Sequence, residues 1–374
     1  MSKLYDDAKR QYQKYLAKRE AAEKERGETV VVSDTLSTAA VPLCFGVIGT
    51  GHVFDRWMHD VQMLPASAGV RVKGVVAGRS DAAQKKAQQY DIPTVYPDYA
   101  SMLQDEEIRA VYVATPNHLH REHVISALRA GKHVLCEKPI AVNTTELQEM
   151  YEAADAADCF LMEGMWMRTL PMIRELVKVV QSGKIGAVRC VETACCNSNS
   201  MEAFPALYSA EKAGGALMDI GCYGLHFVRL LFSGDPEMKG YAISSPTGVD
   251  HTSSVMLRYD DSVAVVTQSI GAAGGARAIL HGTKGSIEVP LFLSPKGFTV
   301  TGMDGFKTHY RYEKEKEARP IGYAYEILHF AECIHKGMRD SDLIPRSETL
   351  AVAAQTEQIR KENGIRLGGE LREA

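Results

Sequence analysis

The chain has 374 residues, 45% of them hydrophobic, which allows two packed domains because single cores stop growing near roughly 250–300 residues. Its 43 Lys and Arg nearly balance 47 Asp and Glu, giving a formal net charge of -4, which argues against nucleic acid as a partner. No apolar run approaches the roughly 18–20 residues of a membrane span, and the N-terminus lacks a signal-peptide core, so we expect a cytoplasmic protein without a membrane partner.

Residues 1–42 are predicted to form a helical arm and a linker. Residues 1 to about 28 are rich in Lys, Glu, Ala and Gln, which favours a solvated helix, and VVVSDTLSTAAVP then gives a short apolar stretch followed by a polar linker. A dispensable arm is favoured over one that clasps another copy of the chain. No chemistry is assigned to it.

Residues 43–162 alternate short apolar runs with helical stretches. The runs include LCFGVIG, VRVKGVVAG, AVYVAT and HVLCEK, and helices are expected near 52–64, 81–90 and 120–130. Continuous apolar strands that alternate with helices are typical of a parallel sheet covered on both faces. The pattern therefore predicts an α/β domain with a doubly wound, Rossmann-type parallel sheet that binds a dinucleotide.

Residues 163–374 show longer helices and then consecutive strand candidates, from AVRCVETACC to SIEVPLFL. Strands joined by short turns predict an α+β domain with a large, open, mostly antiparallel sheet. Helices are expected near 322–338 and after Pro345. We assign substrate binding and oligomerisation to this second domain.

The first apolar run ends in a turn with two glycines, before a predicted helix. Because glycine has no Cβ, such a turn lets the backbone approach a pyrophosphate, and the helix N-terminus adds N–H groups and a positive dipole end. We therefore predict that a dinucleotide contacts Gly49, Gly51, His52, Val53 and Phe54. Phe54 replaces the third glycine of the GxGxxG pattern, so an ordinary tight turn is the alternative.

The second apolar run leads into Gly78, Arg79 and Ser80, where an NAD-specific site would place Asp or Glu for the ribose hydroxyls. Arg79 can pair with a 2′-phosphate, and Ser80 can donate a hydrogen bond to it. The pattern favours NADP(H) as cofactor, with NAD as the alternative. A solvated loop arginine is the competing interpretation.

Two further segments close strands at the same edge of the predicted sheet, where ligands bind in this fold. One is Cys136-Glu137-Lys138-Pro139, whose Lys-Pro bond permits a cis peptide that would turn Lys138 over the nicotinamide. The other runs from Ala114 to His120. The cofactor-binding residues predicted from these segments are Thr115, Pro116, Asn117, His120, Glu137 and Lys138.

Taken in order, the motifs resemble those of the Gfo/Idh/MocA oxidoreductase family. The matching pieces are the GxG turn, the T-P-N-x-x-H segment, the E-K-P triplet and the later GGALMDIGCYGLH, over residues 43–374. The stretch from E-K-P through MEGMWMRTLP is most similar to the dimeric dihydrodiol dehydrogenase and NADP-xylose dehydrogenase branch. The resemblance implies an NAD(P)-dependent dehydrogenase or reductase that acts on CH–OH groups.

GGALMDIGCYGLH opens a predicted apolar helix on which Asp219, Tyr223 and His226 stand at i, i+4 and i+7, on one face. Hydride transfer from a carbinol carbon needs a general base near the hydroxyl proton, and tyrosine, with a pKa of about 10, is a weak base at neutrality. A neighbouring Lys138 ammonium would favour the phenolate, so we predict that it lowers the pKa of Tyr223. Buried polar side chains with structural partners are the alternative.

The resemblance implies the same pairing, because family members place a lysine from E-K-P and a Tyr or His at the position of Tyr223 around the substrate carbonyl. We assign Tyr223 as the catalytic proton donor or acceptor. Lys138 is assigned as its electrostatic partner, and Asp219 as the residue that orients the substrate.

Trp166 and Arg168 match positions that line the substrate pocket in the similar branch, and an arginine there suits an anionic or polyhydroxylated ligand. His226 is predicted to contact substrate hydroxyls or to act as an alternative proton relay. For Arg168, a salt bridge to Glu163 or Glu175 is an equally open interpretation.

His118, His120 and His123 crowd one segment, but a metal site is not predicted there. The segment straddles a strand-to-helix turn, and no carboxylate or thiolate joins the histidines at a standard ligand spacing. The eight cysteines form no CxxC pair, so reduced structural thiols are expected.

The predicted function is NADP(H)-dependent hydride transfer to or from a carbon of a sugar, cyclic polyol or dihydrodiol. The alternatives are a non-catalytic NADP-binding sensor or regulatory protein of the same fold, and a structural oligomer. A sensor has no need of a proton relay, which argues against it. Family analogy leads us to expect a homodimer or homotetramer.

Overall fold

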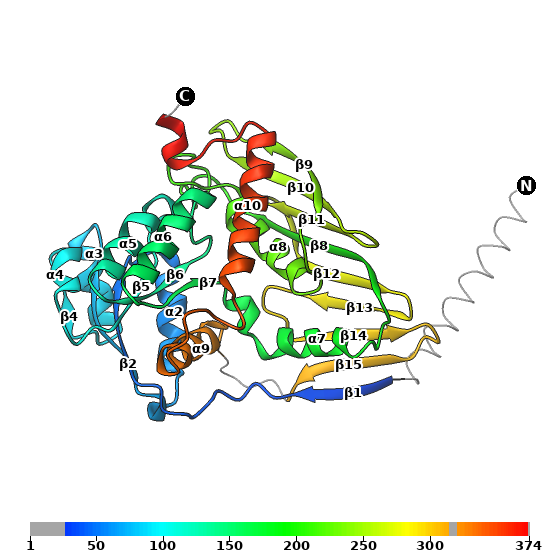
Figure 1. The fold of residues 1–374 in the computed structure, drawn as a ribbon, viewed down its shortest axis with the longest axis horizontal. Helices are drawn as coiled ribbons and strands as arrows, with labels where there is room; N and C mark the ends of the chain where they lie inside the picture. Colours follow the sequence, from blue (N-terminus) through cyan, green and yellow to red (C-terminus); the bar gives the residue numbers. More distant parts are fainter. Residues whose placement is uncertain (1–26, 314–319, 373–374) are drawn as a thin grey trace, which may run out of the picture.

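The computed structural model describes residues 27–313 and 320–372, so the helix predicted at the start of the N-terminal arm lies outside the described residues. Two β-sheets organise this part of the chain, one with six strands and one with nine (Figure 1). We refer to the part built on the six-stranded sheet as the first domain and to the part built on the nine-stranded sheet as the second domain.

The six strands of the first domain run parallel, in the order β4-β3-β2-β5-β6-β7. This order is that of a doubly wound nucleotide-binding sheet, which confirms the predicted Rossmann-type fold. The strands are β2 (Leu43–Ile48), β3 (Val70–Val76), β4 (Thr94–Val95), β5 (Ala110–Val113), β6 (His133–Glu137) and β7 (Leu161–Gly164). The helices are α2 (His52–Gln62), α3 (Ser80–Gln89), α4 (Tyr99–Leu103), α5 (His120–Arg129) and α6 (Thr144–Ala156).

Burial explains why the strands of this sheet read as continuous apolar runs. Every residue of β2 and β5 is buried, because helices cover both faces of the sheet. By contrast, α2 buries only one side, through side chains such as Trp57 and Met58. The Trp57 ring stacks on Tyr112 of β5 with the ring centroids 4.3 Å apart.

The second domain contains nine strands in the order β1-β15-β14-β13-β12-β8-β11-β10-β9. The pairs β1–β15 and β8–β11 are parallel, and the other neighbours are antiparallel, which confirms the predicted mostly antiparallel sheet. The strands are β1 (Gly27–Val32), β8 (Val188–Ser198), β9 (Glu237–Ser244), β10 (Asp250–Arg258), β11 (Val263–Ser269), β12 (Gly271–Gly282), β13 (Gly285–Pro290), β14 (Gly297–Gly302) and β15 (Lys307–Tyr312).

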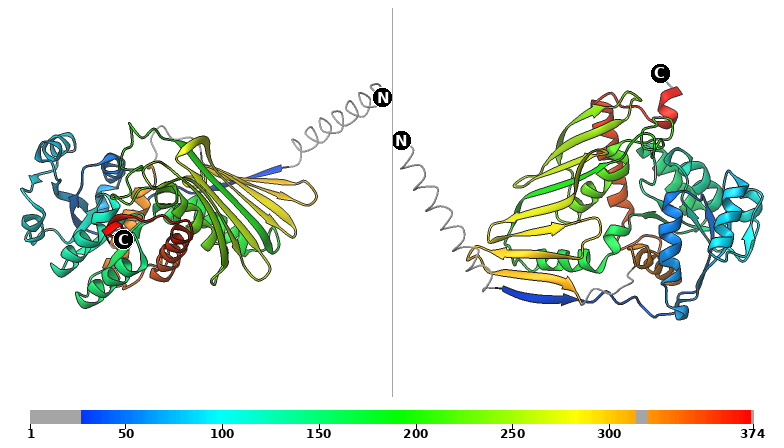
Figure 2. Two further views of the ribbon diagram at one scale, coloured as in Figure 1. Left: turned by 90° about the horizontal axis from the view of Figure 1, so that it is seen from above. Right: turned by 180° about the vertical axis from the view of Figure 1, so that it is seen from behind.

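Helices cover one face of this sheet. α7 (Pro171–Gln181), α8 (Cys222–Arg229) and α10 (Arg346–Glu362) contact its strands, whereas α9 (Tyr323–His335) packs against α2 of the first domain (Figure 2). Gly240 of β9 faces α10, so the exposed side chains of Tyr241 and Ile243 point to the other face. Among the described helices, none is long and apolar enough to cross a bilayer.

Two local features differ from the sequence prediction. Residues 27–32, expected to belong to the arm and linker, form the edge strand β1, which pairs in parallel with β15. A strand whose partner lies at the other end of the chain leaves no local signal of its pairing. The helix expected over GGALMDIGCYGLH begins with a π turn, η4 (Leu217–Gly221), before α8.

Candidate active site

A cavity of about 850 Å³, which we call the strand-end cavity, lies at the carboxyl ends of β2, β3 and β5. The strand order reverses direction between β2 and β5, and open α/β sheets bind ligands at such a switch point. The predicted cofactor residues that line the cavity are Gly49, Gly51, Gly78, Arg79, Thr115 and Pro116.

The glycine turn after β2 has the geometry that a diphosphate requires. Gly49 has a φ of +99°, and a Cβ there would lie 2.4 Å from the carbonyl oxygen of Ala114. A Cβ at Gly51 would meet nothing within 4 Å, so the space above this residue is open. Because α2 begins at His52, the positive end of its dipole lies beside the turn. The turn therefore fits the diphosphate of a dinucleotide.

Two charged residues of the cavity wall, Asp98 and Arg79, differ in their surroundings. The carboxylate of Asp98 caps α4 by accepting a hydrogen bond from the N–H of Ser101 at 2.7 Å, and this bond lowers the pKa of Asp98. Arg79 is exposed at the end of β3 and lines the cavity. The predicted Ser80 begins α3 and is not part of the lining.

Two predicted cofactor residues have side chains that point into the first domain. Phe54 is fully buried and packs edge-on against Tyr90, with ring centroids 5.7 Å apart. Glu137 is also buried, and its carboxylate accepts a hydrogen bond from Tyr112 Oη at 2.5 Å. In both cases the first domain's own core satisfies the side chain.

His120 is a third predicted contact that the fold buries completely. Its ring lies between the carbonyl oxygens of Thr115, at 2.8 Å, and Pro139, at 3.1 Å, and burial lowers its pKa to about 4. The neutral ring carries one N–H, so it donates a hydrogen bond to one of these carbonyl oxygens and packs against the other, between the cavity wall and the loop after Lys138. His123 contacts Thr115 Oγ1 at 3.2 Å, so both histidines have protein partners.

His52, Val53 and Asn117 were also predicted to bind the cofactor, but they do not line the cavity. The wall does include Lys212, a residue of the second domain that the sequence analysis missed. Lys212 lies just before the GGALMDIG segment and belongs to no motif. The sequence therefore gives no sign that it reaches a cavity of the first domain.

Lys138, Trp166, Asp219 and Tyr223 meet between the two domains, and we call these four residues the junction cluster. Lys138 follows β6, and its peptide bond to Pro139 is cis. Its ammonium donates to the Asp219 carbonyl oxygen at 2.6 Å and to Asp219 Oδ1 at 2.9 Å. Burial opposes the charge on Lys138, but Asp219, Cys222 and Glu137 together raise the pKa of Lys138 above its usual range.

Tyr223 lies beside this cation, with Lys138 Nζ 5.1 Å from the centroid of its ring. Trp166 Nε1 donates a hydrogen bond to Tyr223 Oη at 2.8 Å. The phenol oxygen is the acceptor in that bond, so its own proton can be donated to another group. Trp166 begins η3 (Trp166–Thr169), directly after β7, which brings the indole to the cluster.

The predicted lowering of the Tyr223 pKa is wrong. Burial raises the pKa of Tyr223 well above its usual range, and the nearby carboxylates of Glu137 and Asp219 add to the rise, while the Trp166 hydrogen bond opposes it. The Lys138 ammonium does not reverse this result because it is paired with Asp219 and faces the ring rather than the oxygen. At neutral pH the unliganded site therefore holds Tyr223 as a phenol.

Arg168 and His226, predicted as substrate contacts, are both buried and lie close to other polar groups of the protein. His226 is fully buried, with Nε2 3.1 Å from Glu163 Oε2 and Nδ1 3.5 Å from Arg168 Nη1. Arg168 donates to the Leu343 carbonyl at 2.8 Å and lies 3.8 Å from Glu348 Oε2, and burial lowers its pKa to about 10. A buried guanidinium needs such partners, and these contacts link η3 to α8 and to the C-terminal part of the chain.

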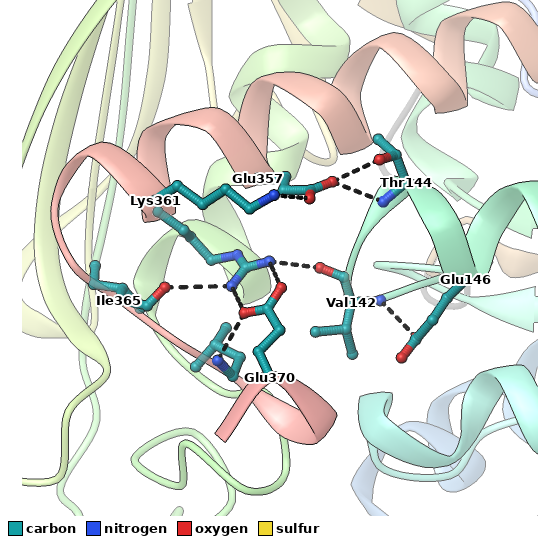
Figure 3. Close-up of polar contacts among 9 residues, drawn as sticks. Val142, Thr144, Glu146, Glu357, Lys361, Ile365 and Glu370 are labelled. Atoms are coloured by element: carbon teal, nitrogen blue, oxygen red, sulfur yellow. Dashed lines mark hydrogen bonds and ion pairs between the residues drawn. The ribbon is translucent and has the colours of Figure 1, made fainter. Parts of the chain in front are cut away.

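The loop after Lys138 is held from the C-terminal part of the chain. The backbone N–H and Oγ1 of Thr144 donate to Glu357 Oε2 at 2.8 and 2.7 Å (Figure 3). Arg360 of α10 is fully buried and donates to the Val142 carbonyl at 2.8 Å and to Glu370 at 2.8 and 3.1 Å. These bonds fix the loop that carries Lys138.

A group of metal-type ligands in the described residues escaped the sequence analysis. One ligand atom from each of His329, Cys333 and Asp342 lies within 4.8 Å of the others. His329 Nε2 already contacts Ser341 Oγ at 2.7 Å, and burial raises the pKa of Cys333 to about 12. Cys333 Sγ also lies 3.5 Å from His329 Nε2, so contacts among its own side chains link the group.

Comparison with known families and proteins gives matches over most of the chain. Residues 43–165 match the Gfo/Idh/MocA oxidoreductase family, NAD-binding Rossmann fold, and residues 173–288 match the Gfo/Idh/MocA C-terminal domain. Trans-1,2-dihydrobenzene-1,2-diol dehydrogenase of Homo sapiens is 33% identical over 338 residues, covering 86% of this chain and 97% of the relative. The Xenopus laevis enzyme of that name is 31% identical over 326 residues, covering 86% and 98%.

Solved structures share the fold. A levoglucosan dehydrogenase in complex with NADH and levoglucosan superposes with a TM-score of 0.78 at 22% identity, covering 86% of this chain and 97% of that one. A 3-ketoreductase from Actinomadura kijaniata in complex with NADP and TDP-benzene gives 0.77 at 22% identity, covering 87% and 99%. An aldose-aldose oxidoreductase from Caulobacter crescentus gives 0.74 at 26% identity, covering 86% and 97%.

Proposed function

The chain belongs to the Gfo/Idh/MocA family of oxidoreductases, and we propose that it transfers a hydride between NADP(H) and a carbinol or carbonyl carbon of a sugar, cyclic polyol or dihydrodiol. The names of its relatives support an NAD(P)-dependent enzyme acting on CH–OH groups, since they are dehydrogenases of a dihydrodiol and of levoglucosan. The strand-end cavity supplies a fitting place for the dinucleotide.

The observation that carries the proposal is the pairing of Lys138 with Asp219 beside Tyr223. These partners stand 81 positions apart in the sequence and meet between the two domains. The buried His120 ring packs between the Pro139 carbonyl, next to Lys138, and the Thr115 carbonyl, so the loop of Lys138 lies against a residue that lines the cavity. A protein that only sensed the dinucleotide would need the cavity and not a proton donor held against a fixed cation.

The bound dinucleotide supplies or accepts the hydride, and the junction cluster manages the proton and the charge on the substrate oxygen. In reduction, Tyr223 donates its phenolic proton to the carbonyl oxygen. The Lys138 ammonium stabilises negative charge as it develops on that oxygen. Asp219, whose side chain is 28% exposed, holds Lys138 and presents a carboxylate oxygen to a substrate hydroxyl.

The resting protonation of the cluster favours reduction at neutral pH. Burial keeps the pKa of Tyr223 well above its usual range, so the residue already carries the proton that a carbonyl oxygen needs. Oxidation of an alcohol needs the phenolate as base, which is scarce at that pH. We therefore propose that carbonyl reduction is the faster direction near neutrality.

Arg79 supports NADP(H) as the preferred cofactor. It is an exposed guanidinium at the carboxyl end of β3, the position from which a side chain reaches the adenosine ribose in this fold. A guanidinium pairs well with a phosphate and offers no acceptor to a free ribose hydroxyl.

We also propose a homodimer or homotetramer formed through the open face of the nine-stranded sheet, in a cytoplasmic setting. Tyr241, Ile243 and Met256 are 70%, 60% and 54% exposed, and contiguous apolar side chains on one face favour self-association. The eight cysteines are all unpaired, which suits a reducing compartment. Light scattering of the purified chain measures the oligomeric state directly.

The test of the function is a screen of the purified chain with NADP(H) and NAD(H) against sugars, inositols, dihydrodiols and the matching carbonyl compounds. On an active substrate, Lys138→Ala and Tyr223→Phe should each lower kcat about 10²–10⁴-fold, because each removes a group that acts on the substrate oxygen. NADPH fluorescence should still report cofactor binding by both variants.

Tyr259→Phe is the matched control, because the buried Tyr259 hydroxyl has no hydrogen-bond partner in the described residues. It should keep wild-type kcat. Wild-type kcat in Lys138→Ala or Tyr223→Phe would remove that residue from the proposed mechanism. Tight NADPH binding without turnover on any compound of the panel would favour the sensor instead.

A further inference from the structure

The segment of residues 199–213, which joins β8 to η4, reaches from the second domain to the strand-end cavity, and we call it the strap. Its first residue is anchored in the second domain, where the N–H of Asn199 donates to the Ile270 carbonyl at 2.8 Å. Tyr208 Oη donates to the Asn199 carbonyl at 2.7 Å and closes the strap into a loop.

Two contacts join the strap to the first domain. The ring of Phe204 meets His52 edge-to-face, with centroids 6.5 Å apart, and His52 directly follows the glycine turn. Asn117 Nδ2 donates to the Ala213 carbonyl at 2.8 Å, and Asn117 directly follows Pro116, which lines the cavity. The strap therefore spans from the glycine turn to the end of β5.

Lys212 is the charged residue that the strap contributes to the cavity wall. The Lys212 ammonium also acts on His118, since burial and this positive charge both lower the pKa of His118. Within residues 27–313 and 320–372 no carboxylate pairs with Lys212, whereas Asp98 of the wall is occupied by its helix cap. Among the described residues that line the cavity, the Lys and Arg side chains are Lys212 and Arg79, and Arg79 stands at the end of β3.

We propose that Lys212 is a ligand of the cofactor diphosphate, supplied by the second domain. The inference rests on the proposed function, because it requires NADP(H) in the strand-end cavity. The diphosphate is favoured over the 2′-phosphate because the strap contacts His52 and Asn117, which flank the glycine turn and β5, whereas Arg79 stands at the end of β3.

The strap also connects the cofactor diphosphate to the junction cluster along the chain. The strap continues into Gly214 and Gly215, and the N–H of Asp219 donates to the Gly215 carbonyl at 2.9 Å. A Cβ on Gly215 would lie 2.4 Å from Asp250 Oδ1, so this connection is closely packed. Holding Lys212 on the diphosphate therefore secures the segment that leads directly to Asp219.

The test measures Kd for NADPH and NADH by fluorescence, with the full chain and its Lys212→Ala variant. Both cofactors carry the diphosphate, so both Kd values should rise by the same factor, about fivefold to tenfold for one partly exposed charge. Lys178→Ala, which removes a lysine on α7 whose side chain is 70% exposed, should leave both Kd values unchanged. NADPH should also protect the wild-type chain from trypsin cleavage after Lys212.

The possible outcomes separate this inference from the proposed function. If the wild type binds neither cofactor, the proposed function fails first. If the wild type binds and Lys212→Ala binds equally well, Lys212 is not a ligand. A loss confined to NADPH would move Lys212 to the 2′-phosphate and overturn its assignment to the diphosphate.

Discussion

The strand-end cavity and the junction cluster serve one proposed reaction, but they are built on opposite principles. The cavity is lined by a glycine turn and strand ends, with an exposed arginine at its edge. In the cluster, the side chain of Lys138 is 12% exposed and Tyr223 is 5% exposed. A charge in the cavity is free to meet its ligand, whereas burial in the cluster sets the protonation state before any ligand arrives.

This difference shows where residue type alone predicts the state of a charged or titratable group. In the cavity, an exposed cation at a strand end predicts an anion partner directly. In the cluster, Lys138 and Tyr223 are neighbours as predicted, but the pKa of Tyr223 is raised rather than lowered, because desolvation and the Asp219 pairing dominate.

The comparison between the cavity and the cluster is tested first at the cavity edge, where we expect a large change in the Kd of NADPH. Arg79→Ala should raise the Kd of NADPH about 10–100-fold and leave that of NADH nearly unchanged, because a charge-assisted hydrogen bond to a phosphate contributes about 1.5–3 kcal/mol. Fluorescence titration with both cofactors measures the ratio. The control is Arg71→Ala, on the same strand, where Arg71 pairs with Glu107 at 3.0 Å.

An unchanged ratio of the two Kd values in Arg79→Ala would remove Arg79 from the 2′-phosphate site. The cavity would then resemble the cluster, in that its charged residue serves the protein rather than the ligand. A loss of similar size for both cofactors would place Arg79 on a part of the dinucleotide that the two share.

A change of about tenfold per pH unit tests the cluster. Burial raises the pKa of Tyr223 well above its usual range, so the phenol is the main form throughout the neutral range. Alcohol oxidation needs the phenolate, and its kcat/KM should rise about tenfold per pH unit as long as the pH is below that pKa. Carbonyl reduction needs the phenol and should stay nearly constant from about pH 6 to 8.

The two pH profiles are measured on the same substrate pair, with NADP+ for oxidation and NADPH for reduction. An oxidation rate that levels off below neutrality would mean that the bound state lowers the pKa of Tyr223, as the sequence alone suggests. The cluster would then be governed by the Lys138 charge rather than by burial.

Much of the first domain can be predicted from sequence because its signals are local. The helices expected near 52–64 and 120–130 are found at His52–Gln62 and His120–Arg129, each directly after a strand and its turn. Strands Glu237–Ser244 and Lys307–Tyr312 were not predicted, because their exposed residues interrupt the apolar pattern that marks a buried strand.

In the candidate active site, too, residues within motifs could be predicted and contacts between distant residues could not. Lys138, Asp219 and Tyr223 could be named from motifs, and the structure brings them together. Their hydrogen-bond partners could not be named, since Trp166 donates to Tyr223 across 57 positions of sequence. Likewise, His226 looked available for a substrate because the sequence does not show that Glu163 is buried beside it.

The smallest predicted effect isolates one hydrogen bond of the cluster. Trp166 Nε1 donates to Tyr223 Oη at 2.8 Å, and this bond opposes the rise in the Tyr223 pKa that burial causes. Trp166→Phe removes the donor, so the pKa of Tyr223 should rise further and the oxidation profile should move to higher pH. At a fixed pH, oxidation should slow about 2–10-fold, as expected for one net hydrogen bond of about 0.5–1.5 kcal/mol.

The second tryptophan of the chain provides the matched control for this change. Trp57 is also buried in an aromatic contact, against Tyr112, but its Nε1 has no hydrogen-bond partner in the described residues. Trp57→Phe should therefore lower the free energy of unfolding, as the loss of buried volume in Trp166→Phe also does, without moving the pH profile. If both variants shift the profile equally, packing rather than the indole hydrogen bond tunes Tyr223. If only Trp166→Phe shifts the pH profile, the hydrogen bond from Trp166 adjusts the pKa of Tyr223, although burial sets the direction of its shift.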